Sequence, residues 1–544
     1  MKKLTGLFLI ATLLLSACST TGGSKKETAS KNTTKQVVSV STPGELSTLD
    51  SGQYSDVNSS DMIGQVTEGL YRSDKNGDPE LALAAAKPEV SADGLTYTFK
   101  LRDAKWSNGD PVTAGDFVYA YQYVVDPKNA SSSSNRLDIF KNASQIRKGT
   151  AAVDTLGVTA VDNKTLKIQL ESPISFLNQI LVGTPFMPKD AKFAQEKGKA
   201  YGTSSANFIG NGPFKIEGWT GANESWKLVK NEDYWDAKNV KLETINVQVV
   251  KETGTGVNLF ETKALDYTTL ADTYAQQYKN NKQAHYVPKA LVGYLSANQK
   301  REVTGNVKAR HAILQAIDKQ SFASEVLGDG STALNGFVPA NFAKDPKNGQ
   351  DFRKENGDLL PFNVEKAQAD WAEAKKELGK EKIQLEVLSA DTANAKKTIE
   401  YVQGQLQKNL PGLTIILKSV PLQNRLDLQS KGDFDLVFGT WTPDYADPIN
   451  FLEFYDSKGG LNTSGYVNAT YDQGLVEART TLANDPTARW QELLKLEKQL
   501  IAQDTAVLPL YQGAVAYLQA DRLQGLQIYP FGRTISYRLA SVTQ

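Results

Sequence analysis

The chain has 544 residues, of which 40% are hydrophobic and 22% charged, a composition typical of folded globular proteins. Its 61 basic residues balance its 61 acidic ones, and no basic cluster or RNA-binding motif stands out, so we expect no nucleic-acid partner. At this length we expect the fold to divide into two to four lobes.

The N-terminus is typical of a secretory signal. Two lysines, Lys2 and Lys3, precede an apolar run from Leu7 to Leu15, and Cys18, the single cysteine of the chain, follows. The sequence Leu15-Ser16-Ala17-Cys18 resembles the lipobox of bacterial lipoproteins, which implies cleavage before Cys18 and diacylglycerol on its sulfur. The alternative is an ordinary signal peptide with a chance cysteine. The apolar run is too short for a dependable transmembrane helix.

A polar segment, "STTGGSKKETASKNTTK", follows Cys18 and holds no large apolar residue. It cannot bury enough apolar surface to offset chain entropy, so we expect a flexible tether. We therefore predict a signal peptide at 1–17, a lipidated cysteine and tether at 18–35, and a folded body that is anchored by lipid to the extracytoplasmic face of the cell membrane.

Strands dominate the first half of the folded body. Apolar residues alternate with polar ones in several segments, as expected for strands with one buried face. Strands and hairpins are predicted at 36–40, 95–107, 157–173, 211–235 and 245–250, and helices around 62–70 and 256–267. Segment 114–125 is predicted to be a helix or a buried segment.

The second half alternates between helices and strands. Helices are predicted at 307–318, 363–378, 395–410 and 486–502, and strands at 383–390, 413–420 and 506–519. This alternation favours an α/β lobe.

Motifs for catalysis are scarce. No H-E-x-x-H, P-loop or G-x-S-x-G motif occurs, and the two histidines, His285 and His311, are isolated. We therefore expect no metal, no cofactor and no enzymatic activity. Asp50-Ser51-Gly52 matches the D-[ST]-G of aspartic proteases, but that chemistry needs two carboxylates that share a proton, and no second copy occurs. A surface peptidase that uses Asp50 is kept as an alternative.

The stretch "FDLVFGTWTPDYADPINF", residues 434–451, places carboxylates and aromatics after a buried strand. We expect this strand to end at Gly439. A buried carboxylate must be hydrogen-bonded inside the protein or completed by a ligand cation. For Asp447 we favour a cap on backbone N–H groups in a turn. For Asp444, beside Trp441 and Tyr445, the residues alone leave both interpretations open.

Several segments together resemble one family, the extracytoplasmic solute-binding proteins of peptide-importing ABC transporters. They occur in the family's order and cover nearly all of the chain after the tether. The matching segments are "STLD" (47–50), "TEGLYR" (67–72), "YTFKLRDAKWSNGDPVTAGDFVYAYQ" (97–122), "GNGPFKIEGW" (210–219), "VKNEDYWD" (229–236), "ALDY" (264–267), "ARHAILQAIDKQ" (309–320) and "FGTWTPDYADPINFL" (438–452).

The resemblance implies an α/β fold with mixed sheets, the two-lobed periplasmic-binding-protein-like fold with an extra subdomain. The lobes close on a peptide. The implied bounds are lobe 1 at 36–75, 205–295 and 505–544, the extra subdomain at 76–204, and lobe 2 at 296–504.

The resemblance also implies the ligand. The family's W-x-x-D-Y aspartate, here Asp444, would pair with the α-ammonium of an extended peptide, beside Trp441 and Tyr445. Backbone at Thr440 and Thr442 would bind one side of the peptide and backbone near Glu68 and Gly69 the other.

The peptide's carboxyl end has no evident partner in the sequence. Leu422, Gln429 and Phe438 stand where some relatives have basic or aromatic residues, so we expect a preference for apolar side chains or longer peptides. Arg425 is either a substitute anchor or part of a solvated face.

The implied protein is a monomer that delivers oligopeptides to the transmembrane subunits of an ABC permease. A receptor for a signalling peptide is the alternative within the family. A surface adhesin or chaperone that binds unfolded segments is a further one.

Overall fold

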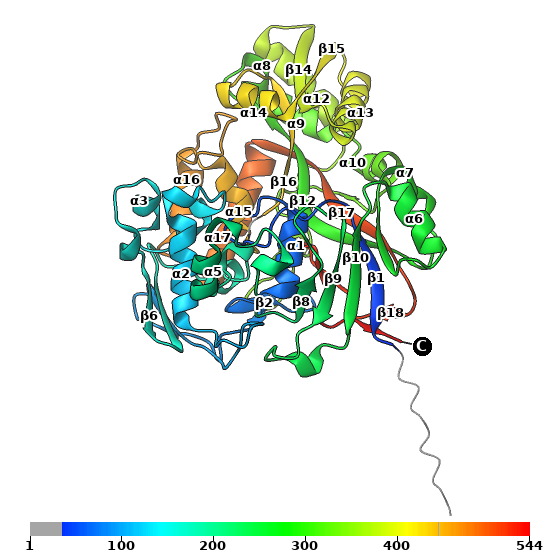
Figure 1. The fold of residues 1–544 in the computed structure, drawn as a ribbon. Helices are drawn as coiled ribbons and strands as arrows, with labels where there is room; N and C mark the ends of the chain where they lie inside the picture. The colour runs from blue at the N-terminus through cyan, green and yellow to red at the C-terminus, as the bar shows by residue number, and fades with distance from the viewer. Residues whose placement is uncertain (1–34, 444, 544) are drawn as a thin grey trace, which may run out of the picture. The chain divides into compact units, whose positions relative to one another are not determined.

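One mixed sheet of eleven strands extends through the part of the chain that the structure describes, residues 35–443 and 445–543 of a computed structural model (Figure 1). Predictions that concern the signal peptide, Cys18, the tether up to residue 34, and Asp444 therefore fall outside the described residues. In spatial order the strands are β15 (Leu413–Val420), β14 (Ile383–Ala390), β16 (Leu436–Trp441), β12 (Ala284–Ala297), β17 (Val507–Gln519), β11 (Tyr267–Leu270), β1 (Val37–Thr42), β10 (Thr244–Val249), β9 (Ser225–Lys230) and β8 (Phe214–Glu217), with β13 (Thr332–Ala333) on β17.

The sheet mixes parallel and antiparallel pairs, as predicted for this fold class. β14 runs parallel to β15 and β16, and β1 runs parallel to β10 and β11, whereas β12 and β17 pair antiparallel with their neighbours. A second sheet has the order β4 (Glu89–Val90), β5 (Thr96–Lys100), β7 (Thr165–Gln169) and β6 (Val158–Asp162). Short pairs join β2 (Tyr71–Ser73) to β3 (Pro79–Leu81), β18 (Leu523–Gln524) to β21 (Ser541–Val542), and β19 (Gln527–Ile528) to β20 (Ile535–Ser536).

Helices flank these sheets. Asp56 caps α1 by accepting a hydrogen bond from the Ser59 backbone N–H, and Thr113 with Asp116 forms a capping box on α2. The α-helices are α1 (Val57–Val66), α2 (Ala114–Val125), α3 (Ala143–Arg147), α4 (Leu177–Ile180), α5 (Ala191–Lys197), α6 (Thr253–Glu261), α7 (Asp272–Gln277), α8 (Glu302–Gly305), α9 (Val307–Gln315), α10 (Lys319–Ser321), α11 (Phe352–Asn356), α12 (Val364–Leu378), α13 (Ala393–Asn409), α14 (Leu422–Lys431), α15 (Ile449–Leu452), α16 (Ala469–Arg479) and α17 (Pro486–Lys498). None of the described helices combines the length and the apolar character that spanning a bilayer requires.

Two long strands, β12 and β17, connect the ends of the large sheet and lie between β16 and β11 (Figure 1). Their register shifts between Pro288 and Val292, where the proline interrupts regular pairing. Gln512 bridges this irregularity by donating to the Lys289 carbonyl at 3.0 Å and to the Ala340 carbonyl at 2.9 Å. The sequence analysis did not identify β12, because Pro288 and Gly293 weaken its strand pattern.

Buried apolar residues form separate cores. One core draws on residues between Ala290 and Tyr511, and a second on residues between Leu70 and Ile209. A third combines residues from 38–66, 194–267 and 517–542. The bounds of the lobes and of the extra subdomain stay a prediction.

Most strongly patterned elements are confirmed. The helix at 114–125, the hairpin of β6 and β7, and the strands at 383–390 and 413–420 lie where the sequence predicts them. Several predicted bounds are wrong. The helix predicted around 62–70 begins at Val57 and ends at Val66, so Leu70 lies outside it. The strand expected to stop at Gly439 continues to Trp441, because β12 pairs with it along its whole length. The helix expected over 256–267 ends at Glu261, and β11 begins at Tyr267.

Candidate functional site

The candidate site begins at an unpaired strand edge. β12 pairs with all of β16, from Leu436 to Trp441, but β14 pairs with only Leu436 and Val437. The other edge of β16 is therefore without a partner strand from Phe438 to Trp441 among the described residues. Phe438 directs its carbonyl to this edge, where it accepts a hydrogen bond from Arg425 Nη1 at 3.4 Å. Since backbone groups alternate between the two edges of a strand, those of Thr440 face the same open side.

Trp441 ends this edge and Tyr445 follows in the next loop, and neighbouring residues hold both rings. The Trp441 indole N–H donates to Asn450 Oδ1 at 3.3 Å. The Tyr445 ring stacks on Phe176 at a centroid distance of 5.0 Å, and its hydroxyl donates to Glu453 Oε1 at 2.8 Å. Burial and the Glu453 carboxylate raise the pKa of Tyr445 well above its ordinary value. The Tyr445 side chain is therefore neutral, and its neighbours fix the position of its ring.

The two threonines of the predicted site, Thr440 and Thr442, are both exposed to solvent. Thr442 and Pro443 line a cavity of about 410 Å³, together with residues from five other parts of the chain. These segments contribute the hydroxyl-bearing residues Tyr54, Ser55, Ser60, Ser73, Ser132, Ser133 and Thr184, and the arginines Arg136 and Arg533. The loop after β16 thus faces a cavity whose lining includes many hydroxyl groups.

Asp447 is hydrogen-bonded inside the protein. Its carboxylate makes a bidentate pair with the Arg489 guanidinium at 2.7 and 2.8 Å, and both side chains are buried. Asp447 Oδ1 also accepts from the Ile449 backbone N–H at 3.0 Å. The predicted turn cap is confirmed, and Arg489 is the partner that the sequence did not reveal. This pair fixes the chain three residues beyond Asp444.

Glu68 and Gly69 lie in a densely bonded segment after α1. The Asn211 side chain accepts from the Glu68 N–H at 2.8 Å and donates to the Glu68 carbonyl at 3.1 Å. The Gly69 carbonyl accepts from the Leu83 N–H at 3.0 Å. Three of the backbone groups that the sequence analysis offers to a peptide are thus occupied within the protein. Their role in ligand binding stays a prediction.

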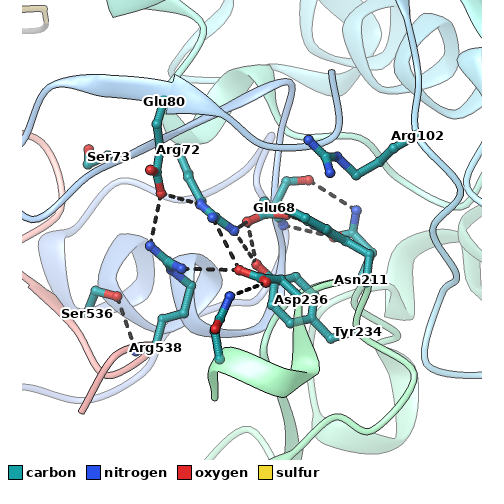
Figure 2. Close-up of polar contacts among 12 residues, drawn as sticks. Glu68, Arg72, Ser73, Glu80, Arg102, Asn211, Tyr234, Asp236, Ser536 and Arg538 are labelled. Atoms are coloured by element: carbon teal, nitrogen blue, oxygen red, sulfur yellow. Dashed lines mark hydrogen bonds and ion pairs between the residues drawn. The ribbon is translucent and has the colours of Figure 1, made fainter. Parts of the chain in front are cut away.

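A network of hydrogen bonds and ion pairs surrounds the Glu68 side chain (Figure 2). Glu68 accepts from Tyr234 at 2.6 Å and from Trp235 at 2.5 Å, and it pairs with Arg72 at 3.0 Å. Burial opposes the charge of Arg72, but Glu68 and Tyr234 outweigh it, so the pKa of Arg72 rises above its ordinary value. The network continues through the ion pairs of Arg72 and Arg538 with Glu80 and Asp236.

Glu68 and Gly69 also line a small cavity of about 30 Å³. Ser73 and Arg533 line both this cavity and the larger one beside Thr442. The structure therefore brings the two halves of the predicted site, far apart in the chain, to adjacent cavities.

The remaining candidate groups are engaged elsewhere. Asp50 is buried and forms an ion pair with Lys189. His285 stacks on Tyr517 at 5.1 Å, and burial lowers the pKa of His311, which lies 3.3 Å from the Gln503 carbonyl. Among the described residues, no group of three or more histidine, cysteine or acidic side chains is placed to hold a metal ion.

Comparison with known proteins places the chain in a family. The family model described as "Bacterial extracellular solute-binding proteins, family 5 Middle" matches residues 78–463. The chain belongs to this family of solute-binding proteins. Within family 5, a "Dipeptide-binding protein" of Lactococcus lactis subsp. cremoris (strain MG1363) is 33% identical over 94% of this chain and 95% of its own.

Solved structures of family 5 members agree with this assignment. "Listeria monocytogenes OppA bound to peptide" is 42% identical, with a TM-score of 0.73 over 94% of this chain and 99% of its own. A structure of the pheromone receptor PrgZ is 37% identical, with a TM-score of 0.74 over 94% of this chain and 100% of its own. The unliganded open form of the murein tripeptide-binding protein MppA is 28% identical, with a TM-score of 0.80 over 93% and 97%. The predicted family and two-lobed fold class are confirmed.

Proposed function

We propose that this protein captures oligopeptides and delivers them to an ABC permease. The observation that carries the proposal is the open edge of β16, from Phe438 to Trp441, which is followed by Thr442 in the lining of the larger cavity. An extended peptide binds such an edge through main-chain hydrogen bonds, which are indifferent to side chains. The Listeria relative was solved with a peptide bound, and the Lactococcus relative is called a dipeptide-binding protein, which supports this ligand class.

The peptide's N-terminus defines the register in this proposal. Asp444 pairs with the α-ammonium, and the backbone at Thr440 and Thr442 binds the first residues. Each main-chain hydrogen bond contributes about 0.5–1.5 kcal/mol, and the charge-assisted contact about 1.5–3 kcal/mol. Trp441 and Tyr445 form rigid walls, because neighbours hold both rings.

The fold has a higher TM-score with an open relative than with a peptide-bound one. Its TM-score is 0.80 with the unliganded open form of MppA and 0.73 with the peptide-bound Listeria protein. We infer that peptide binding closes the two predicted lobes, with β12 and β17 as the connecting strands.

Location and assembly are a further part of the proposal. We propose that the mature chain is a monomer, attached to the outer face of the cell membrane through lipid on Cys18. A Cys18→Ala variant is then expected in the culture medium rather than in the membrane fraction. Retention of this variant on the membrane would contradict the lipid anchor.

A binding experiment tests the main proposal. The purified protein is analysed by mass spectrometry for co-purifying ligand, then titrated with defined peptides of two to nine residues. We expect one peptide per protein and recovery of the peptide intact. Failure to bind any peptide would overturn the proposal, and cleavage of the peptide would favour the peptidase alternative.

A receptor for a signalling peptide is the second candidate, favoured by the 37% identity to the pheromone receptor PrgZ. The two roles differ in their ligands. A nutritional transporter should co-purify with a mixture of sequences, whereas a dedicated receptor should carry one.

A further inference from the structure

One arginine beside the open edge has no acidic partner. Arg425, on α14, is partly buried, and no described carboxylate forms an ion pair with it. Its Nη1 donates to Gln429 Oε1 at 2.8 Å and weakly to the Phe438 carbonyl. Its Nε is buried without an acceptor, and among the described residues no atom accepts from Nη2. By contrast, carboxylates pair with the arginines Arg72, Arg353, Arg479, Arg489 and Arg538.

This arrangement costs free energy in the ligand-free protein. A guanidinium that loses water without gaining an anion is destabilised. Accordingly, burial lowers the pKa of Arg425, and only the Tyr294 phenol acts in the other direction. A partly buried cation without an acidic partner is typical of a site where a ligand supplies the negative charge.

The fold holds the guanidinium against the edge of β16. A Cβ atom on Gly439 would approach Arg425 Nη1 to 3.3 Å and the Tyr294 hydroxyl to 3.4 Å. The glycine therefore leaves room for Arg425 to lie on the strand. Gln429 Nε2 donates to Thr463 Oγ1 at 2.8 Å, which orients its amide oxygen toward Arg425. The guanidinium is positioned, with Nη2 left for a ligand oxygen.

We propose that Arg425 binds the C-terminal carboxylate of the captured peptide, a role that rests on the proposed peptide-binding function. The edge from Phe438 to Trp441 spans about 10 Å at roughly 3.3 Å per residue. An extended ligand that follows this edge and ends at Arg425 covers it with about three residues. The proposal differs from the preference for apolar side chains or longer peptides expected from the sequence, because it gives the carboxyl end an anchor beside Gln429 and Phe438.

Binding of matched ligands tests this assignment. Wild-type protein is titrated with a neutral tripeptide as free acid and as C-terminal amide, and with an amidated tripeptide ending in glutamate. We expect the free acid to bind about 10- to 100-fold more tightly than its amide, the range of a charge-assisted hydrogen bond. Arg425→Gln should bind acid and amide equally, and Arg425→Lys should restore part of the difference. Arg301→Gln is the matched control, because Arg301 pairs with Asp433 at the surface.

Other outcomes decide against the assignment. Equal binding of acid and amide by the wild type would overturn it, as would an undiminished preference in Arg425→Gln. If the amidated glutamate peptide matched the free acid, Arg425 would bind acidic side chains instead. Absence of binding to every peptide would instead overturn the proposed function.

The melting temperature of ligand-free protein gives an independent readout. Removing an unpaired, partly buried charge should leave Arg425→Gln at least as stable as wild type. A melting temperature well below that of Arg301→Gln would assign Arg425 a structural role and overturn the inference.

Discussion

The Asn211 side chain binds both backbone groups of Glu68, accepting from its N–H and donating to its carbonyl. This is the pattern by which a neighbouring strand would bind Glu68. Asn211 lies between Gly210 and Gly212, and a Cβ atom at either glycine would collide with the Val66 backbone. The "GNGPF" segment therefore approaches the end of α1 closely enough for this contact.

Removal of the Asn211 amide should destabilise the fold. In Asn211→Ala the buried N–H and carbonyl of Glu68 lose their partners, which costs about 1–3 kcal/mol of unfolding free energy. Urea denaturation measures this, with Asn258→Ala, an exposed position on α6, as the control. Equal stability of the two variants would show that Asn211 is dispensable.

The Arg489–Asp447 pair should contribute to stability through its geometry. Arg489→Met leaves the Asp447 carboxylate buried without its partner, at an expected cost of about 3–5 kcal/mol. Arg479→Met is the control, because Arg479 pairs with Glu453 and Asp456 from a partly exposed position, where about 0–1 kcal/mol is typical. Similar losses of unfolding free energy in the two variants would show that the buried pair contributes no more to stability than the partly exposed one.

Asp61 should make stability fall as pH rises. Burial raises its pKa from 3.8 to about 7, although the Thr534 backbone N–H and Lys289 lower it. Between these two values the unfolded chain releases the proton while the folded protein retains it, so each step upward favours unfolding. The loss is complete above about pH 7 and amounts to about 2–4 kcal/mol.

Asp61→Asn isolates this contribution. Its amide oxygen can still accept from the backbone, but it cannot ionise. The unfolding free energy of this variant relative to wild type should rise by the stated amount from pH 4.5 to 7.5. Asp154→Asn, at an exposed position, serves as the control. Parallel pH profiles for wild type and Asp61→Asn would disprove the raised pKa.

Thr440 tests whether the open edge of β16 binds peptide backbone. Its N–H faces away from β12, so a proline there should be compatible with folding. Thr440→Pro removes one main-chain donor and should weaken peptide binding about 2- to 13-fold. Thr440→Val keeps the donor and should bind as the wild type does. If only Thr440→Val lost affinity, the peptide would bind the Thr440 hydroxyl and not the backbone N–H.

The sequence predicted local elements well where their periodicity was strong, as in α2, α12, β14 and β15. It missed β12, whose pairing depends on two strands distant in the chain. The site was predicted through motif resemblance rather than through physical pattern. Asn211 and Arg489 could not be identified, because their partners lie 143 and 42 residues away. The Arg425 interpretation depended on an absence of acidic neighbours that only the fold reveals.

The central claim is that the negative charge of Asp444 selects peptides by their free amino end. Calorimetric titration of Asp444→Asn with a tripeptide and with its N-acetylated form tests it most directly. The account predicts that the variant binds the free-amine peptide about 10- to 100-fold more weakly than wild type does, with no change for the acetylated peptide. Equal losses for both peptides, or none for either, would contradict it.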